Sequence, residues 1–303
     1  MTGVPAVSVI VPVFNGEGTL GALLSSLRGL VPHPLGGTEF IIVDNGSTDT
    51  SRQMAESAGI KGLRVVDEPR RGPAAARNRG LAEARGDLLA LLDDDSVASR
   101  RWLRELVAPF SDPTVQIVAG GLASYPPRTG AQRFAARYGL NDATRAVEMQ
   151  TMPFANTRNM AVRRSVAKAV GGWPEELIVG EDVEFSYRVR SRFGCAIDYR
   201  PAALVFDQDR ETDEELWHQA NGYGRSMADL YALHPDVLPW HWRQNLHRRR
   251  RSTQRRLAAA IGRLQRRLGR GDPEMIEFRE YLAGWDRSFW RGFDDAGGAA
   301  LRG

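Results

Sequence analysis

Residues 88–95 read LLALLDDD, in which five apolar residues end at three carboxylates. A short, continuous apolar run is typical of a strand that is buried on both faces, as the strands of parallel sheets are. We therefore expect a core strand over 87–92. Three further runs rich in valine, leucine and isoleucine precede it, at 7–14, 39–43 and 63–66. The first part of the chain thus predicts four buried strands.

Amphipathic stretches at 19–30, 49–58 and 73–84 lie between these strands. The last of them begins with Pro73, a residue type that is favoured in the first turn of a helix. Strand and helix alternate, which predicts an α/β protein whose mostly parallel sheet carries helices on both faces. Polar residues follow each strand, and the carboxyl ends of parallel strands meet at one edge of a sheet. We therefore expect a ligand crevice at that edge.

The later part of the chain is less regular. The elements that we expect there are helices at 99–110, 164–170, 181–192 and 214–233 and strands at 115–119, 154–162 and 203–206. The composition changes near residue 235, where an arginine-rich segment begins. The sequence therefore predicts a core domain over residues 1–235 and an arginine-rich helical extension over residues 236–303.

Three carboxylates follow the strand at 87–92. In extended backbone, Asp93 and Asp95 would point to one side of the chain and Asp94 to the other. Carboxylate oxygens in this number suit Mg²⁺ or Mn²⁺, held together with substrate phosphates. The alternative is a solvated acidic turn before the next helix. For an isolated triplet the two interpretations stay open.

Five motifs in order place the triplet in a wider pattern. They are the segments 7–15 (VSVIVPVFN), 41–51 (IIVDNGSTDTS), 72–80 (GPAAARNRG), 159–164 (NMAVRR) with 171–177 (GGWPEEL), and 180–184 (GEDVE). Together with the triplet they closely resemble the family 2 glycosyltransferases of GT-A fold, over roughly residues 6–207. The resemblance implies a Rossmann-like sheet with helices on both faces, to which this chain adds a C-terminal helical appendage.

The resemblance also implies a donor, a nucleotide-diphosphate sugar, with a UDP-sugar as the first expectation. The positions that match its binding residues are Pro12, Phe14, Asn15, Asp44, Arg77, Asp93, Asp94 and Arg225. Asp95 matches the direct ligand of the Mg²⁺ or Mn²⁺ ion, and Asp207 stands where many relatives have a metal-binding histidine. Three of these positions have a plain structural alternative: Asp44 could cap the turn at Ser47 and Thr48, Arg77 could lie exposed on a helix surface, and Arg225 could serve ordinary helix packing.

Asp182 matches the general base that would take the proton of an acceptor hydroxyl, which implies inversion at the sugar carbon. Glu181 and Trp173 lie in segments that match the acceptor side. The alternatives are that carboxylates at a helix start only complement its dipole, and that Trp173 is a core residue. The Gln/Arg-x-x-Arg-Trp motif of processive relatives is absent from the sequence, so we expect single additions.

Two other functions stay open at this stage. A nucleotidyltransferase that forms nucleotide sugars would need a basic, glycine-rich loop after the first strand, and residues 14–18 (FNGEG) have no basic group. A sugar-nucleotide sensor would not need Asp182. The single cysteine, Cys195, excludes an intrachain disulfide and fits a reducing cytoplasm. No apolar run approaches the roughly 20 residues of a membrane-spanning helix.

The segment 241–271 contains eleven arginines and no acidic residue. Its apolar positions Leu257, Ile261, Leu264 and Leu268 form one stripe of a helix. Three interpretations compete: docking on this chain or on a second copy in a homodimer, peripheral binding to an anionic membrane, and nucleic-acid binding, for which no module is present. We favour docking, with the stripe buried against a second helix at 274–290, and expect no nucleic acid.

Overall fold

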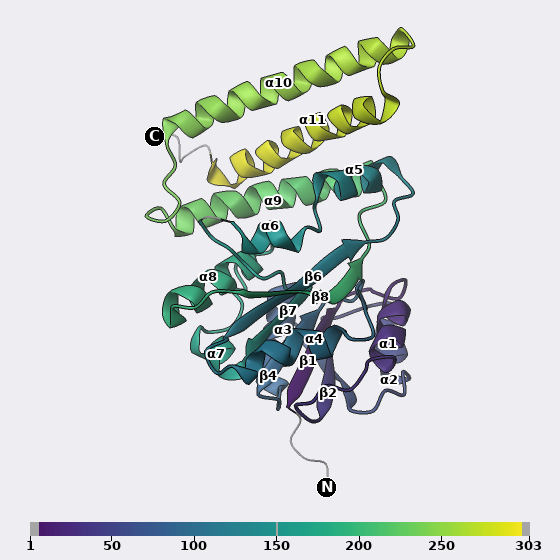
Figure 1. The fold of residues 1–303 in the computed structure, drawn as a ribbon, viewed down its shortest axis with the longest axis vertical. Coiled ribbons are helices and arrows are strands. Elements are labelled where there is room, and N and C mark those ends of the chain that lie inside the picture. The colour runs from purple at the N-terminus through teal and green to yellow at the C-terminus, as the bar shows by residue number, and fades with distance from the viewer. Residues whose placement is uncertain (1–5, 150, 299–303) are drawn as a thin grey trace. The chain divides into compact units, whose positions relative to one another are not determined.

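The computed structural model describes residues 6–149 and 151–298, and the chain divides into two compact units (Figure 1). The first unit contains the chain up to Tyr125 together with Asn141–Gln208. The second contains Pro126–Leu140 and the chain from Asp209 onward. Each unit has its own hydrophobic core, and each is described by itself below.

The first unit is built on one eight-stranded sheet in the order β3-β2-β1-β4-β7-β6-β8-β5. The strands are β1 (Val7–Val13), β2 (Thr38–Asp44), β3 (Leu63–Asp67), β4 (Leu88–Leu92), β5 (Val97–Ala98), β6 (Ile117–Ser124), β7 (Asn159–Arg163) and β8 (Asp198–Asp207). The first four pair in parallel, as the alternation of strand and helix predicts. β7 is antiparallel to both of its neighbours, so the sheet is mixed on that side.

Helices cover both faces of this sheet, which confirms the predicted fold class. The helices of the first unit are α1 (Leu20–Arg28), α2 (Ser51–Glu56), α3 (Pro73–Glu83), α4 (Trp102–Val107), α6 (Ala143–Val147), α7 (Arg164–Ala169) and α8 (Glu181–Phe193), with the 3-10 turn η1 (Ala108–Ser111) after α4. α1, α2 and α4 pack on one face and α3, α7 and α8 on the other. The short helix α6 was not predicted.

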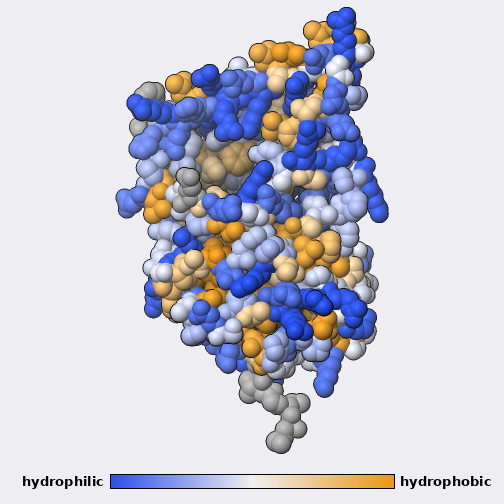
Figure 2. Space-filling view, in the orientation of Figure 1, coloured by the Kyte–Doolittle hydropathy of each residue, from blue (hydrophilic) through white to orange (hydrophobic). Residues whose placement is uncertain are grey.

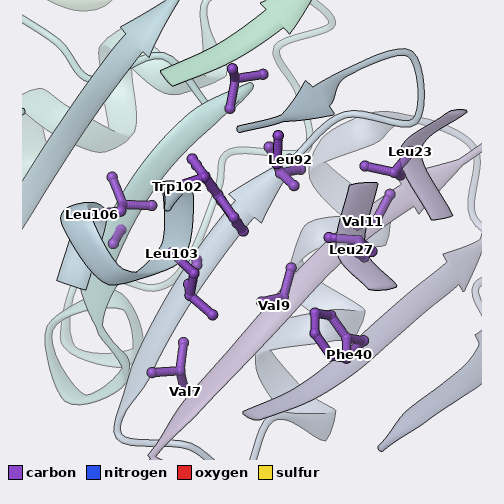
Figure 3. Packing of buried hydrophobic residues seen from close by; sticks show 14 of the residues in the cluster. Val7, Val9, Val11, Leu23, Leu27, Phe40, Leu92, Trp102, Leu103 and Leu106 are labelled. Atoms are coloured by element: carbon purple, nitrogen blue, oxygen red, sulfur yellow. The ribbon is translucent and has the colours of Figure 1, made fainter. Parts of the chain in front are cut away.

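Both faces of β1 are buried, which explains why all of its residues except Ser8 are apolar. Ser8 is also buried, and its hydroxyl donates to Glu39 at 2.6 Å. Val7, Val9 and Val11 point toward α1 and α4, where they meet leucines of both helices and Trp102 (Figure 3). Ile10 points to the opposite face and packs with α3 and its neighbours. All four side chains are fully buried, so a polar residue at any of these positions would lose the hydrophobic free energy of burial, roughly 1.5–3 kcal/mol for a side chain of this size.

The second unit is helical. It contains α5 (Gly130–Tyr138), α9 (Asp213–Leu233), α10 (Trp242–Arg267), α11 (Pro273–Phe293) and the π-helical turn η2 (Asp294–Gly298), and α10 and α11 run side by side in Figure 1. Its core gathers aromatic rings around Phe134 and Trp285. α9 and α11 approach closely, because an added Cβ at Gly224 would meet the carbonyl oxygen of Phe289 at 1.8 Å. No side chain larger than glycine fits there.

The predicted burial of the α10 leucine stripe is wrong. Leu257, Ile261, Leu264 and Leu268 are 60%, 46%, 57% and 60% exposed. α10 does pack on α11, as predicted, but through its opposite face, where Ala259 is buried and Gly262 lies against α11. The physical reason is charge. Asp286 of α11 and Asp294 of η2 pair with Arg255 and Arg248, which turns these arginines inward and the leucines outward, and Arg266 pairs with Glu280 nearer the surface.

The units do not follow the predicted boundary at residue 235. α9, which we assigned to the core domain, packs most extensively with α11 in the second unit, and α5, which we did not predict, joins them. The assignment of activity to residues 1–235 concerns function and stays a prediction. In the described part of the chain, we find no helix with the length and apolar character required to cross a membrane.

Candidate active site

The loop after β1 is held to the loop after β2 by polar side chains. Asn15, which has a positive φ of 51°, accepts a hydrogen bond at Oδ1 from the backbone N–H of Thr48 at 2.8 Å. Its own N–H donates to the hydroxyl of Ser47 at 3.1 Å. Asp44, 7% exposed at the end of β2, accepts from the N–H of Ser47 at 2.9 Å. The turn-capping use of Asp44 is therefore present, and its contact with a nucleotide base stays a prediction.

Phe14 follows β1 directly and so lies at the same edge of the sheet. Its side chain is 50% exposed. The guanidinium carbon of Arg71 lies 4.2 Å from the centre of its ring, in cation–π geometry. Pro12, at the end of β1, is half-buried and paired with Val43 of β2. Phe14 and Arg71 together present an aromatic and a cationic group, which suit a nucleobase and a phosphate.

The acidic triplet does not continue the strand, contrary to the alternation that we expected. β4 ends at Leu92, and the N–H of Ser96 donates to the carbonyl of Asp93 at 3.2 Å, which closes a turn. The three carboxylates therefore diverge. Asp93 accepts from Arg77, while Asp94 points toward the backbone of Gly16, where an added Cβ would meet its Oδ2 at 2.4 Å. Burial and the neighbouring Asp93 raise the pKa of Asp94 to about 6.

Asp95 is directed toward the end of β8. Val97, two residues after Asp95, pairs with Phe206, and Asp207 follows directly. Burial raises the pKa of Asp95 to about 7, and the charge of Asp207 adds to the rise. The Oδ1 atom of Asp95 is buried and has no hydrogen-bond partner among the described residues. Two close carboxylates, one with an orphaned oxygen, are a donor set that fits Mg²⁺ or Mn²⁺.

Asp207 is 2% exposed and forms an ion pair with Arg158. Arg158 also donates to Asn141 at 2.8 Å. Within 6–149 and 151–298, no three histidine, cysteine, aspartate or glutamate side chains are grouped to hold a metal ion by themselves. A divalent ion at Asp95 and Asp207 would therefore take its other ligands from water and substrate phosphates, as Mg²⁺ usually does.

Arg77 of α3 joins two parts of the site. Its side chain is 3% exposed, its Nη2 donates to Asp93 at 2.9 Å and its Nη1 donates to Glu181 at 2.6 Å. Arg77 is therefore not an exposed surface arginine, and both of its terminal nitrogens are engaged by protein carboxylates. Its predicted contact with the nucleotide stays a prediction.

Asp182 lies beside this bridge, in the first turn of α8, with its Oδ1 accepting from the N–H of Val183 at 2.9 Å. Burial raises the pKa of Asp182 to about 7, and the charge of Glu181 adds to the rise, while Arg77 opposes it. The reference pKa of an aspartate is near 4, so this carboxyl group is tuned toward neutral pH. A carboxylate with a pKa near the working pH is suited to accept a proton.

Trp173 occupies a position in the hydrophobic core, which is one of the two interpretations that the sequence left open. Its side chain is 1% exposed, and its ring stacks on Phe185 of α8 with 4.4 Å between ring centres. Asn78 of α3 fixes its backbone through hydrogen bonds to the N–H and the carbonyl, both of 2.8 Å. Its burial does not favour stacking on an acceptor, and that role stays only a prediction.

Comparison with protein families identifies this arrangement. Residues 8–171 match the model of glycosyl transferase family 2. The chain belongs to the family 2 glycosyltransferases. The pre-mycofactocin glycosyltransferase of Mycobacterium tuberculosis is 32% identical over 236 residues, which are 76% of this chain and 48% of that protein. The glycosyltransferase AglE of Haloferax volcanii is 31% identical over 188 residues, 61% of each chain. The chain spans about half the length of the first of these relatives.

Solved structures support the GT-A fold of this family 2 member. A mannosyltransferase of Pyrobaculum calidifontis, in complex with GDP-Man and Mn²⁺, superposes with a TM-score of 0.59 at 19% identity over 99% of this chain and 76% of that one. TarS of S. aureus in complex with UDP-GlcNAc gives a TM-score of 0.51 at 17% identity, over 97% of this chain and 92% of that one. At such identities the likeness concerns the fold.

Three site residues of this glycosyltransferase family member were missed. Arg158 directly precedes the motif at 159–164, and Arg71 precedes the motif at 72–80, so both could have been included as flanking cations. Tyr125 could not have been predicted from the sequence, because its proximity to Asp207 depends on the pairing of β6 with β8. Arg225 lies in the second unit, 3.9 Å from Asp295, and its predicted contact with the diphosphate stays a prediction.

Proposed function

We propose that this family 2 member transfers a single sugar from a nucleoside diphosphate sugar to an acceptor hydroxyl, with inversion at the anomeric carbon. One observation carries the proposal. Arg77 binds Asp93 and Glu181 at once, so the acidic triplet and the segment with Asp182 form one site. Asp93, which would contact the donor, and Asp182, which would act as the base, are thereby linked through a single arginine.

The donor would bind along the loops after β1 and β2. Asp44 would accept from a nucleobase N–H with its Oδ2, which lies 3.6 Å from Nη1 of Arg52, and Phe14 offers an exposed ring for stacking. Arg71, held over that ring, carries a charge for the diphosphate. Two structural neighbours, one in complex with GDP-Man and one in complex with UDP-GlcNAc, support a nucleotide sugar as the class of donor and leave both bases to be tested.

The proposal includes a divalent cation, because the buried and orphaned Oδ1 of Asp95 lies in a carboxylate pair that fits one. Asp95 and Asp207 would hold Mg²⁺ or Mn²⁺, which supplies positive charge beside the departing diphosphate. Arg158 would orient Asp207 through their ion pair. The Mn²⁺ in the mannosyltransferase structure supports this choice of ion.

Asp182 would act on the acceptor. As the acceptor oxygen forms its bond to the anomeric carbon, its proton passes to a carboxylate oxygen of Asp182. The bond from the anomeric carbon to the diphosphate oxygen breaks at the same time, and the diphosphate leaves with the electron pair. Attack opposite to the leaving group inverts the configuration. The single cysteine is consistent with the reducing cytoplasm as the compartment for this reaction.

The test combines binding with turnover. Thermal shift with UDP, GDP and dTDP, each with Mn²⁺ or with EDTA, identifies the base and the metal requirement, since a ligand that binds only the folded state raises the melting temperature. Release of the matching diphosphate from nucleotide sugars is then measured with candidate acceptors, and NMR of the product reports the anomeric configuration. Retention of configuration, or binding without turnover for any acceptor, would contradict the proposal.

A further inference from the structure

The outer face of α10 is an apolar stripe with no protein partner in the described chain. Leu246, Leu257, Ile261, Leu264 and Leu268 are each between 46% and 60% exposed. At 100° per residue all five fall within a narrow sector of the helix, because Leu246 precedes Leu257 by three full turns. Orange groups interrupt the blue surface along α10 in Figure 2. The stripe is continuous from Leu257 to Leu268, whereas Arg250 and Thr253 separate that part from Leu246. An exposed apolar stripe of this kind marks an interaction surface.

The inner face of α10 already forms ion pairs with acidic residues of α11 and η2. Arg248 pairs with Asp294 at 2.5 Å, Arg255 pairs with Asp286, and Arg266 pairs with Glu280 at 2.8 Å. These contacts hold α10 on α11 in one orientation. The stripe therefore cannot turn inward unless three ion pairs break, and its exposure is built into the packing of the two helices.

The flank of the stripe is strongly basic. A groove of about 440 Å³ between α10 and α11 is lined by four exposed arginines and by Trp290. These arginines are Arg249, Arg256, Arg287 and Arg291. None of the four forms an ion pair with another described residue. The lining of the groove also includes Asp286 and Asp294, whose charges are compensated by their ion pairs with Arg255 and Arg248. Guanidinium groups with no carboxylate partner, beside an indole, are suited to bind phosphate groups.

We infer that α10 and this groove bind an anionic lipid surface. The leucine stripe would enter the boundary between headgroups and acyl chains, while the groove arginines contact lipid phosphates. The combination favours lipid over the other occupants. Nucleic acid would use the arginines but leave five apolar side chains in water, and a second copy of the chain would bring two unpaired arginine clusters together.

Vesicle flotation tests the inference on the full chain. Vesicles of phosphatidylcholine alone are compared with vesicles that contain 30% phosphatidylglycerol as a probe, at about 50 mM and 300 mM salt. We expect binding to the anionic vesicles at low salt, weaker binding at high salt because charges are screened, and little binding to neutral vesicles. Equal binding to both vesicle types, or none, would overturn the inference.

Two sets of variants separate the two parts of the surface. Leu257→Gln with Leu264→Gln replaces two apolar side chains of the stripe. The matched control is Ile178→Gln, at an 83% exposed position of the first unit. Arg249→Gln with Arg256→Gln weakens the groove, and Arg101→Gln with Arg104→Gln, at exposed positions of the first unit, is the control. We expect on the order of a five-fold loss of affinity per groove arginine. The control variants should bind as the unchanged protein does.

The melting temperature and the mass in solution complete the test. All of these side chains are exposed, so the variants should melt within a few degrees of the unchanged protein. Light scattering should find the same mass for the protein and for its stripe variant. If the protein is a dimer and the stripe variant is a monomer, a second copy of the chain is the occupant instead of lipid. If a duplex oligonucleotide binds more tightly than anionic vesicles at the same salt, nucleic acid is the occupant.

Discussion

The Nη1 atom of Arg77 lies 2.6 Å from Oε1 of Glu181, a residue 104 positions further along the chain. Its Nη2 atom lies 2.9 Å from Oδ1 of Asp93. One buried cation thus compensates two carboxylates that would otherwise repel each other. The ion pair between Arg77 and Glu181 joins α3 to α8. The arrangement of the acidic triplet and of the start of α8 therefore depends on the Arg77 side chain, which both contact.

Replacement of Arg77 by methionine should therefore lower the free energy of unfolding by about 3–5 kcal/mol, since it leaves the buried Glu181 and the partly buried Asp93 without their shared partner. The matched control is Arg79→Met on the same helix. Arg79 is 40% exposed and pairs with Glu83, so its loss should cost under about 1 kcal/mol. Urea unfolding of both variants measures the difference. Equal losses would mean that Arg77 has no special structural role.

Asp95→Asn should remove the Mn²⁺-dependent part of the affinity for the nucleoside diphosphate. A neutral amide is a poor substitute for a carboxylate at a hard cation. Titration calorimetry with and without Mn²⁺ measures this part, and the metal-free affinity should stay unchanged. Asp112→Asn, in an exposed turn, is the control. If the variant keeps its full response to Mn²⁺, Asp95 is not a ligand.

Asp182→Asn should lower kcat by about 10²-fold or more and leave donor affinity nearly unchanged, because the base acts on the acceptor proton in the transition state. The control is Asp87→Asn, whose side chain is 91% exposed. Initial rates at saturating donor give kcat, and titration with the nucleoside diphosphate gives the affinity. Turnover within a few-fold of the unchanged protein would transfer the role to Glu181 or to water.

The pH dependence follows from the raised pKa of Asp182, about 7 in the protein without ligands. Below this pH the carboxyl group is protonated and cannot accept the acceptor proton. The value of kcat/KM should therefore fall by up to about tenfold for each pH unit below 7 and level off above it. A pH profile between 5.5 and 8.5 tests this. The residual kcat/KM of Asp182→Asn should not show this fall below pH 7.

Trp173→Ala should act on stability. The substitution removes a fully buried ring from its stack on Phe185 and should lower the free energy of unfolding by about 3–5 kcal/mol. Trp173→Phe keeps part of the stack and should cost less. Where both variants are folded, KM for the acceptor should stay the same. A large rise in KM in the folded phenylalanine variant would restore the acceptor role.

The sequence by itself determined the first four strands, the class of the fold and the order of the motifs, whereas it missed β5 and predicted different bounds for β7 and β8. Apolar runs such as 88–92 and the helix period of 73–83 are local properties, and parallel strands bring the residues that follow them to one edge. Asp44 and the acidic triplet could therefore be assigned to one edge of the sheet from spacing alone. The strand ends agree with the structure to within a few residues for the first four strands.

Only the tertiary structure decided which partner each side chain has. The turn at 93–96 separates the carboxylates that an extended chain would have aligned, and the burial of Arg77 depends on Glu181 from a distant helix. The orientation of α10 depends in the same way on the acids of α11. Periodicity identifies an apolar face, but a helix rich in arginine has two faces that can pack. The charges on its neighbour select between them, and those charges lie elsewhere in the chain.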